Sequence, residues 1–210
     1  MEKNTLLKTS ALPLFSKMKK KDMFPAIKYL VDENKSIIKK IENLKAPTWN
    51  NLVYKLEESD DKISKAWAPI RHLNSVMNDK EIRAQYEKSL NLLTSHYGKI
   101  GQNKKLFSQY EKLYEQNRKN LTQSQNKLLE NVLRGFRLSG VHLNVKKRKL
   151  FRECQEKLAK LESKFEQNIL DSSNSWAKNF KTIENLKGMP QSSLEIAEET
   201  AAKRNEVGYT

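Results

Sequence analysis

The sequence is poor in cysteine, glycine and proline, and it has no long apolar run. Its 210 residues contain one cysteine, six glycines and five prolines. The single cysteine, Cys154, excludes an intramolecular disulfide and is typical of a reducing, cytoplasmic environment. So few glycines and prolines leave little turn chemistry, which favours a small number of long helices. No apolar stretch approaches the roughly 20 residues that span a bilayer. The patch at 11–15 is too short for a secretory signal, and a lysine run follows it.

Positive charge is abundant. The formal net charge is +15, with 31% charged and 37% hydrophobic residues. A basic surface attracts nucleic acid or anionic lipid by neutralising phosphates. The excess is lysine, however, with 32 Lys against 8 Arg, and it is scattered apart from clusters at 17–21 and 146–149. Readout of bases and bidentate grips on phosphate use arginine. We therefore interpret the charge as compositional drift and keep a basic module that binds an anionic partner as the alternative.

The segment 48–78 is the strongest helical pattern. Thr48 is placed to cap it after Pro47, and Pro69 predicts a kink or a break. Steps of three and four residues put its apolar side chains on one face, which predicts a buried stripe with two tryptophans as core anchors. The stripe consists of Trp49, Leu52, Val53, Leu56, Ile63, Trp67, Ile70, Leu73, Val76 and Met77. The opposite face, predicted to be solvated, carries Lys55, Glu57, Glu58, Asp60, Asp61 and Lys65.

Further helices are predicted on both sides of this segment. One runs from about Asp22 to residue 44. A second is capped by Asp79 and continues to residue 114, with a bend near Gly98 and Gly101. A third opens at 120–122 and ends at Gly140, which we interpret as a conformational requirement of the stop rather than a binding residue.

A fourth helix is predicted from an Asn144 cap to residue 176. Its apolar stripe is Phe151, Cys154, Leu158, Leu161, Phe165 and Ile169. The spacing from Phe151 to Phe165 alternates three and four, as in a coiled-coil seam, so packing within the domain and pairing with a second copy are both open. Packing within the domain is favoured, and Cys154 is then a buried, inert thiol.

The pattern changes after residue 176. The segment 177–183 predicts a short extended stretch without a partner, 188–190 a turn, and Ser192 with Glu195 a capping box that opens a last helix. We therefore predict an all-α fold with three parts: an irregular basic lead-in over 1–21, a helical domain over 22–176, and over 177–210 the start of a following region. The ending is interpreted as a truncation.

The sequence offers no catalytic or metal site. Its histidines, His72, His96 and His142, lie 24 and 46 residues apart, so no two are one helical turn apart, and none is followed by Glu. An H-E-x-x-H zinc site therefore cannot be built. We expect each histidine to make an ordinary polar contact or to face solvent. No catalytic, cofactor-binding or metal-binding residue is predicted.

Four ordered segments carry a family resemblance. They are PTWNNLVYKLEESDDKISKAWAPIRHLNSVMND (47–79), LLENVLRGFRLSGVHL (128–143), LESKFEQNILDSSNSW (161–176) and LKGMPQSSLEIAEETAAKRNEVGY (186–209). Together they resemble the N-terminal region of oligopeptidase A-like members of the thimet oligopeptidase–neurolysin family of zinc metallopeptidases. The resemblance implies a helical wall of a deep channel that admits short, unfolded peptides. It also implies that zinc and the catalytic residues belong to a later region.

The function expected from this resemblance is that of a channel wall without chemistry of its own. The chain alone should be inactive and should bind no cofactor. Its expected partner is a separate catalytic half, with short peptides as substrates only of the completed enzyme. Neither a membrane nor nucleic acid is expected as a partner.

Overall fold

The structure is a computed structural model that describes residues 4–8, 12–77 and 79–210. Within these ranges the fold is all-α, as predicted: seven α-helices and several shorter helical turns, with one isolated β-bridge and no strand. The chain divides into two units, Met1–Lys160 and Leu161–Thr210, and the division falls inside the longest helix. None of the helices in the described ranges is long and apolar enough to cross a membrane.

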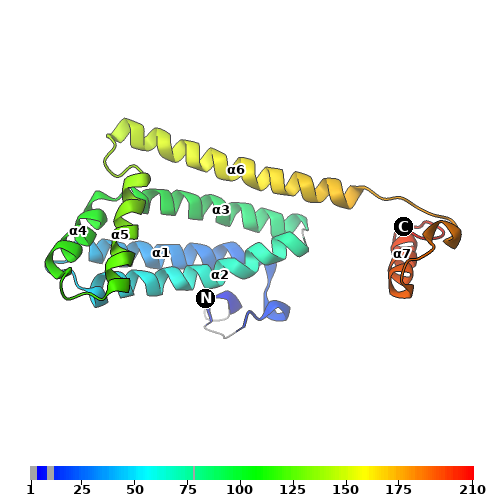
Figure 1. Cartoon of the computed structure of the whole chain (residues 1–210), viewed down its shortest axis with the longest axis horizontal. Coiled ribbons are helices and arrows are strands. Elements are labelled where there is room, and N and C mark those ends of the chain that lie inside the picture. Colours follow the sequence, from blue (N-terminus) through cyan, green and yellow to red (C-terminus); the bar gives the residue numbers. More distant parts are fainter. Residues whose placement is uncertain (1–3, 9–11, 78) are drawn as a thin grey trace. The chain divides into compact units, whose positions relative to one another are not determined.

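Three long helices form the body of the first unit. They are α1 (Met23–Ile41), α2 (Lys55–Val76) and α3 (Lys80–Gly101), which contact one another pairwise and run side by side (Figure 1). Two shorter helices, α4 (Lys104–Asn117) and α5 (Gln123–Leu138), pack together at one end of this bundle. Each long helix buries one stripe and exposes a charged face, which suits the low mean hydropathy of −0.80.

Predicted start and stop signals act as helix caps. The Thr48 side chain accepts from the Asn51 N–H, and Asp79 Oδ1 accepts from the first-turn N–H groups of α3 at 2.9 and 3.0 Å. Thr122 caps α5 through a reciprocal capping box. Gly140, just past α5, has φ +82°, the left-handed conformation that favours glycine. These four predictions are confirmed.

One predicted boundary was wrong. Of the kink or break predicted at Pro69, the break does not occur, because α2 continues through this buried proline to Val76. The helix expected over 79–114 is two helices: α3 ends at Gly101, and Asn103 caps α4 by accepting from two backbone N–H groups at 3.1 Å. An asparagine cap two residues after a helical glycine outweighs a continuous apolar pattern.

The first unit has two apolar clusters. The three-helix cluster joins the first half of α1 to the middle of α2 and to α3; it contains Met23, Ala26, Ile27, Leu30, Val31, Ile63, Ala66, Ile70, Ile82, Tyr86, Leu93 and also Leu6. The end cluster joins the last turns of α1 and the start of α2 to α4 and α5; it contains Ile38, Ile41, Leu52, Val53, Leu56, Leu106, Phe107, Tyr110, Leu113, Leu129, Leu133, Phe136 and Val141.

The two tryptophans of segment 48–78 belong to different clusters. Trp49 lies in a π-helical turn, Trp49–Tyr54, ahead of α2 and packs against the end cluster. Trp67 packs against the three-helix cluster and stacks on Tyr86 with ring centroids 5.0 Å apart. Their role as core anchors is confirmed. The stripe ends early, however, because Val76 and Met77 are each 61% exposed.

The described residues of the basic lead-in include short helical turns. They form three single 3₁₀ turns, Thr5–Leu7, Phe15–Lys17 and Lys20–Asp22. Leu6 is buried in the three-helix cluster, and Asn4 Nδ2 donates to the carbonyl oxygen of Asp22 at 2.8 Å. Residues 1–3 and 9–11 of the predicted lead-in lie outside the described residues.

The longest helix, α6 (Val145–Ser175), does not bury its apolar stripe. Asn144 caps it as predicted, accepting from the Lys147 N–H at 2.9 Å. Leu158, Leu161, Phe165 and Ile169 are exposed, whereas Phe151 is half-buried. Cys154 is exposed too, and is therefore not the buried thiol expected. Packing of this stripe within the domain was the wrong prediction.

The second unit closes on itself through one backbone bridge. Phe180 and Tyr209 exchange two N–H···O bonds of 2.8 Å, so the extended segment after residue 176 does have a partner. Asn179 Nδ2 reinforces the bridge by donating to Thr210 Oγ1 at 2.9 Å. The last helix, α7 (Gln191–Lys203), starts after Pro190 without a side-chain cap, and so the predicted Ser192–Glu195 capping box is wrong.

Candidate functional site

A layer of polar side chains separates the two apolar clusters in the bundle. Asn34 of α1 lies at its centre: its Nδ2 donates to Ser59 Oγ and to Asp60 Oδ1 of α2, both at 3.0 Å. On the other side, Asn34 Oδ1 lies 2.9 Å from His96 Nε2 of α3. One amide therefore joins three helices. Asn34, Ser59 and His96 are at most 4% exposed.

The partners of Asn34 decide which ring nitrogen of His96 carries the proton. A carboxylate only accepts hydrogen bonds, so the Asn34 NH₂ group must face Asp60 and its oxygen must face His96. The oxygen also only accepts, and therefore His96 Nε2 is the donor. His96 is thus fixed as an Nε2–H tautomer, with that nitrogen unavailable to a metal.

Burial moves two pKa values in this layer in opposite directions. It lowers the pKa of His96 to about 4, with Lys35 and Lys99 contributing in the same direction and Asp32 opposing. It raises the pKa of Asp60 to about 6, assisted by repulsion from Glu57 and opposed by the hydrogen bond from Asn34. Both shifts disfavour the charged form, as desolvation does. Asp60 is therefore not the solvated face residue that was expected.

This layer aligns the helices rather than performing catalysis. Asn34 hydrogen-bonds to each of the other three members, and three of the four are buried away from any substrate. A fully connected polar layer in an apolar core makes any shift of one helix along another costly. The spacing 82, 86, 89, 93, 96, 100 could have identified His96 as a core position; the neighbouring Tyr97 is 40% exposed.

A second polar junction fixes the start of α6 to the end of α3. Gln102, 4% exposed, donates from Nε2 to the Ser139 carbonyl oxygen at 3.1 Å. Its own carbonyl oxygen accepts from Arg148 at 3.2 Å, and its Oε1 accepts from Arg152. Two arginines on the polar side of α6 therefore bind the start of this helix to Gln102 at the end of α3.

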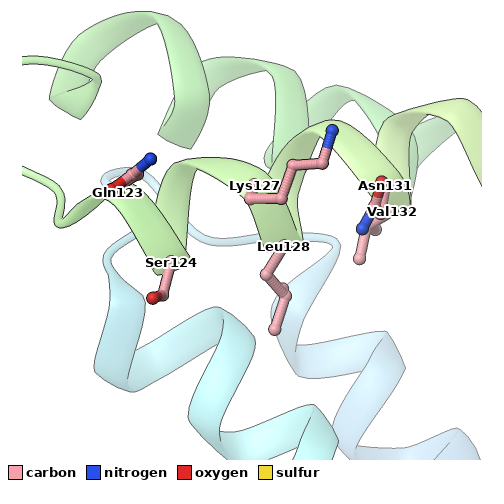
Figure 2. Close-up of a pocket in the computed structure, with 6 residues that line it drawn as sticks. All are labelled: Gln123, Ser124, Lys127, Leu128, Asn131 and Val132. Carbon is pink, nitrogen blue, oxygen red and sulfur yellow. The ribbon is translucent and has the colours of Figure 1, made fainter.

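The surface of the first unit carries a depression of about 710 Å³ along the first half of α5. Figure 2 shows its lining, with Lys127 and Leu128 pointing in opposite directions from the helix. Leu128 and Val132 also pack against the end cluster, so the floor is apolar. The remaining lining residues are Gln123, Ser124 and Asn131. None of the six is an acid or a histidine that could activate Ser124, and so this lining is suited to contact, not to nucleophilic chemistry.

The histidines do not form a zinc site. His72 and His142 are exposed and lie against Phe15 and Phe107, with ring centroids 5.5 and 5.2 Å apart. His96 is committed to Asn34. Over the described ranges, no three His, Cys, Asp or Glu residues gather where they could hold a metal ion. The residues present therefore do not fit the zinc that the family resemblance implies for the whole enzyme.

The fold is that of an all-helical domain, and its described residues include no cluster that fits a metal ion. The family model "Neurolysin/Thimet oligopeptidase, N-terminal domain" matches residues 27–148, which are more than half of the chain. The chain belongs to this family. The match covers all of α1 to α5 except the first four residues of α1.

The most similar relatives include bacterial and plant proteins of one name. Oligopeptidase A of Haemophilus influenzae is 35% identical, over 98% of this chain and 30% of that protein. Oligopeptidase A of Escherichia coli is 33% identical, over 98% of this chain and 31% of that protein. A probable cytosolic oligopeptidase A of Arabidopsis thaliana is 27% identical, over 97% of this chain and 29% of that protein. The chain thus spans about a third of the length of the curated relatives that it matches.

Proposed function

We propose that this chain is the channel-wall part of an oligopeptidase A-like zinc metalloendopeptidase that degrades short peptides. The observation that carries the proposal is the likeness to oligopeptidase A over 98% of the chain, together with the match to the N-terminal domain model. A wall must hold its shape while peptides pass. The three-helix bundle, with its two apolar clusters and a hydrogen-bonded layer between them, is suited to this.

The proposal assigns the chemistry to a catalytic region outside these 210 residues. In the family, two histidines of H-E-x-x-H hold zinc and the glutamate between them activates the bound water. No histidine of this chain has that spacing. We propose that the chain is inactive alone and that a separate catalytic half completes the enzyme. The cytoplasm is its proposed location, in keeping with one relative named cytosolic, although another is named organellar.

The test is a peptidase assay with zinc on two proteins. One is the isolated chain, and the other is a chimera in which this chain replaces the matching part of Haemophilus influenzae oligopeptidase A. We expect no cleavage of short peptides by the isolated chain and chelator-sensitive cleavage by the chimera. A chimera with the H-E-x-x-H glutamate changed to glutamine is the matched control. Tight one-to-one zinc binding with chelator-sensitive cleavage by the isolated chain would overturn the proposal.

A further inference from the structure

The depression along the first half of α5 is lined by two neighbouring rows of side chains. The polar row is Gln123, Lys127 and Asn131, and the floor row is Ser124, Leu128 and Val132. Residues four apart on a helix lie one above the other, so each row follows the helix. Figure 2 shows Gln123 and Lys127 on one side of α5 and Ser124 and Leu128 on the other. A ligand that lies along the helix between the two rows can contact both.

The lining has hydrogen-bonding groups that the fold does not use. No residue in the described ranges hydrogen-bonds to the Gln123 amide or to the Ser124 hydroxyl group. Asn131 accepts from Arg134 at 2.9 Å through its Oδ1, and its NH₂ group has no such partner in the same ranges. By contrast, lysines on the exposed face of α2 pair with acids three or four residues away. A few unused polar groups beside an apolar floor are typical of a ligand site.

The spacing of the two rows matches an extended peptide. Residues four apart on a helix are separated by about 6 Å along its axis. In an extended chain, side chains on one side recur every two residues, or about every 6.6 Å. A peptide along α5 can therefore place alternate side chains on Leu128 and Val132 while its main chain faces Gln123 and Asn131. The lining from 123 to 132 is about 13.5 Å long, which accommodates about four extended residues.

A helical ligand fits the polar row less well than an extended one. A helix pairs most of its main-chain N–H and C=O groups internally, so it has few to offer to the amides of Gln123 and Asn131. A carboxamide has both donors and an acceptor. It can therefore pair with the N–H and the C=O groups that an extended main chain leaves open.

The charge of the lining favours a ligand with a carboxylate group. Of the six lining residues, only Lys127 is charged. Its ion pair with Glu130 spans 3.7 Å between exposed side chains, and such a pair contributes little to stability. Lys127 can therefore exchange Glu130 for a carboxylate of a ligand at little cost. The chain's net charge of +15 attracts anionic ligands as well.

We propose that this depression, which we call the α5 subsite, binds about four residues of a short, extended peptide that has a free carboxylate. The proposal rests on the proposed function, which makes short peptides the ligands of this domain. The amides of Gln123 and Asn131 pair with the peptide main chain. Leu128 and Val132 receive its apolar side chains, and Lys127 attracts its carboxylate.

An NMR titration of the isolated, isotope-labelled chain tests the α5 subsite. The probe is N-acetyl-Leu-Ala-Leu-Ala with a free C-terminal carboxylate. We expect saturable shifts of the backbone amides of 123–132. The variant Gln123→Ala, Asn131→Ala should raise the dissociation constant at least about fivefold, because it removes two partners of the peptide main chain. The matched control Asn91→Ala, Gln116→Ala changes two exposed amides outside the lining and should leave the constant unchanged.

Two altered peptides separate the contacts. The same peptide with methylated main-chain nitrogens lacks the N–H donors, and its C-terminal amide lacks the carboxylate. Each should bind more weakly than the parent peptide, and Lys127→Gln should abolish only the difference between acid and amide. Equal binding of the methylated and parent peptides would overturn the main-chain pairing. The absence of saturable shifts at 123–132, or the same dissociation constant in the Gln123→Ala, Asn131→Ala variant, would overturn the α5 subsite.

The two proposals fail in different ways. In a chimera that cleaves peptides, Gln123→Ala, Asn131→Ala should raise KM without lowering kcat, as the loss of uniform binding does. Cleavage with an unchanged KM in this variant supports the proposed function and rejects the α5 subsite. A chimera that does not cleave, together with saturable binding of the probe at 123–132 of the isolated chain, supports the subsite and rejects the proposed function.

Discussion

The end of α3 lies so close to the end of α5 that a Cβ atom on Gly101 would be 2.7 Å from the Ser139 Cβ atom. Real Cβ atoms do not approach one another this closely, so glycine at residue 101 is what allows the two helix ends to meet. The same junction is held by Gln102, which donates to the Ser139 carbonyl oxygen.

Gly101→Ala should therefore destabilise the fold, by about 1–3 kcal/mol in the free energy of unfolding, since overpacking displaces neighbouring backbone. Gly98→Ala is the matched control on the same helix, because its Cβ would meet only the Arg152 side chain at 3.6 Å, an ordinary contact. It should stabilise by about 0.5–1 kcal/mol, as alanine does in a helix interior. Urea unfolding checks both, and equal signs for the two variants would contradict this account of the helix junction.

A second prediction concerns the amide that joins three helices. Asn34→Ala removes the hydrogen bonds to Ser59, Asp60 and His96 together and leaves a small cavity. We expect a loss of about 2–4 kcal/mol, from unsatisfied buried groups and lost packing. Asn43→Ala, at an exposed residue near the end of α1 that donates to the Lys39 carbonyl oxygen, should change stability by less than about 1 kcal/mol. A similar effect of the two variants on the urea midpoint would show that the layer does not act as described.

The opposite pKa shifts of His96 and Asp60 predict compensating pH dependence. His96, with its pKa lowered to about 4, stays neutral in the fold while the unfolded chain takes up a proton below about 6.5. Its contribution is present above pH 6.5 and lost as the pH falls to 4. Asp60, with its pKa raised to about 6, keeps its proton in the fold where the unfolded chain releases it. Its contribution is present below about 3.8 and lost as the pH rises to 6.

Replacing one of these two titrating side chains should reveal the pH dependence of stability that the other contributes. Asp60→Asn should lose more stability than the unmodified chain when the pH is lowered from 7 to 4.5, because the His96 loss is no longer offset. His96→Gln should lose less than the unmodified chain over the same range. Urea midpoints at the two pH values test this, and comparing variants cancels the titration of Asp32 and Asp79. The same change in urea midpoint in all three proteins would show that His96 and Asp60 do not make these compensating contributions.

How much could be predicted from the sequence depends on which interactions are local. Caps join side chains to backbone groups two or three residues away. The caps at Thr48 and Asp79 and the start of a helix at 120–122 were therefore predicted correctly. The hydrogen bond between Asn34 and His96 joins residues 62 apart. Periodicity can mark His96 as a core position, but it does not show that this position pairs with Asn34 of another helix.

The apolar stripe of α6 shows the complementary limit. Periodicity correctly identifies an amphipathic helix, but it does not say whether the apolar side faces the same domain or another molecule. Arg148 and Arg152, which bind Gln102, lie on the other side of the helix, and only Arg148 belongs to the basic cluster at 146–149. Cys154 was misplaced for the same reason: it shares the stripe, and the stripe is exposed.

The lysine excess leads to a prediction about nucleic acid. Several exposed lysines pair with acids three or four residues away, such as Lys65 with Asp61 at 2.6 Å and Lys28 with Asp32 at 2.9 Å. If the charge is compositional drift, binding to duplex DNA should be weak and independent of sequence. It should also be lost between about 50 and 200 mM salt. Fluorescence anisotropy with two unrelated duplexes checks this, and tight, sequence-selective binding at 200 mM salt would favour the basic-module alternative.

The last prediction concerns the second unit, Leu161–Thr210. Only Ser163, Leu194 and Ala201 are buried in it, and its single β-bridge joins Phe180 to Tyr209. Local stability follows buried apolar contact and protected backbone bonds, and an isolated bridge supplies little of either. We expect amide hydrogens after residue 177 in the isolated chain to exchange at least a hundredfold faster than those of α2. Mass spectrometry of peptides from 177–210 and from Lys55–Val76 measures both in one sample. Equal protection of the two in a monomer would show that the second unit is stable by itself and needs no partner.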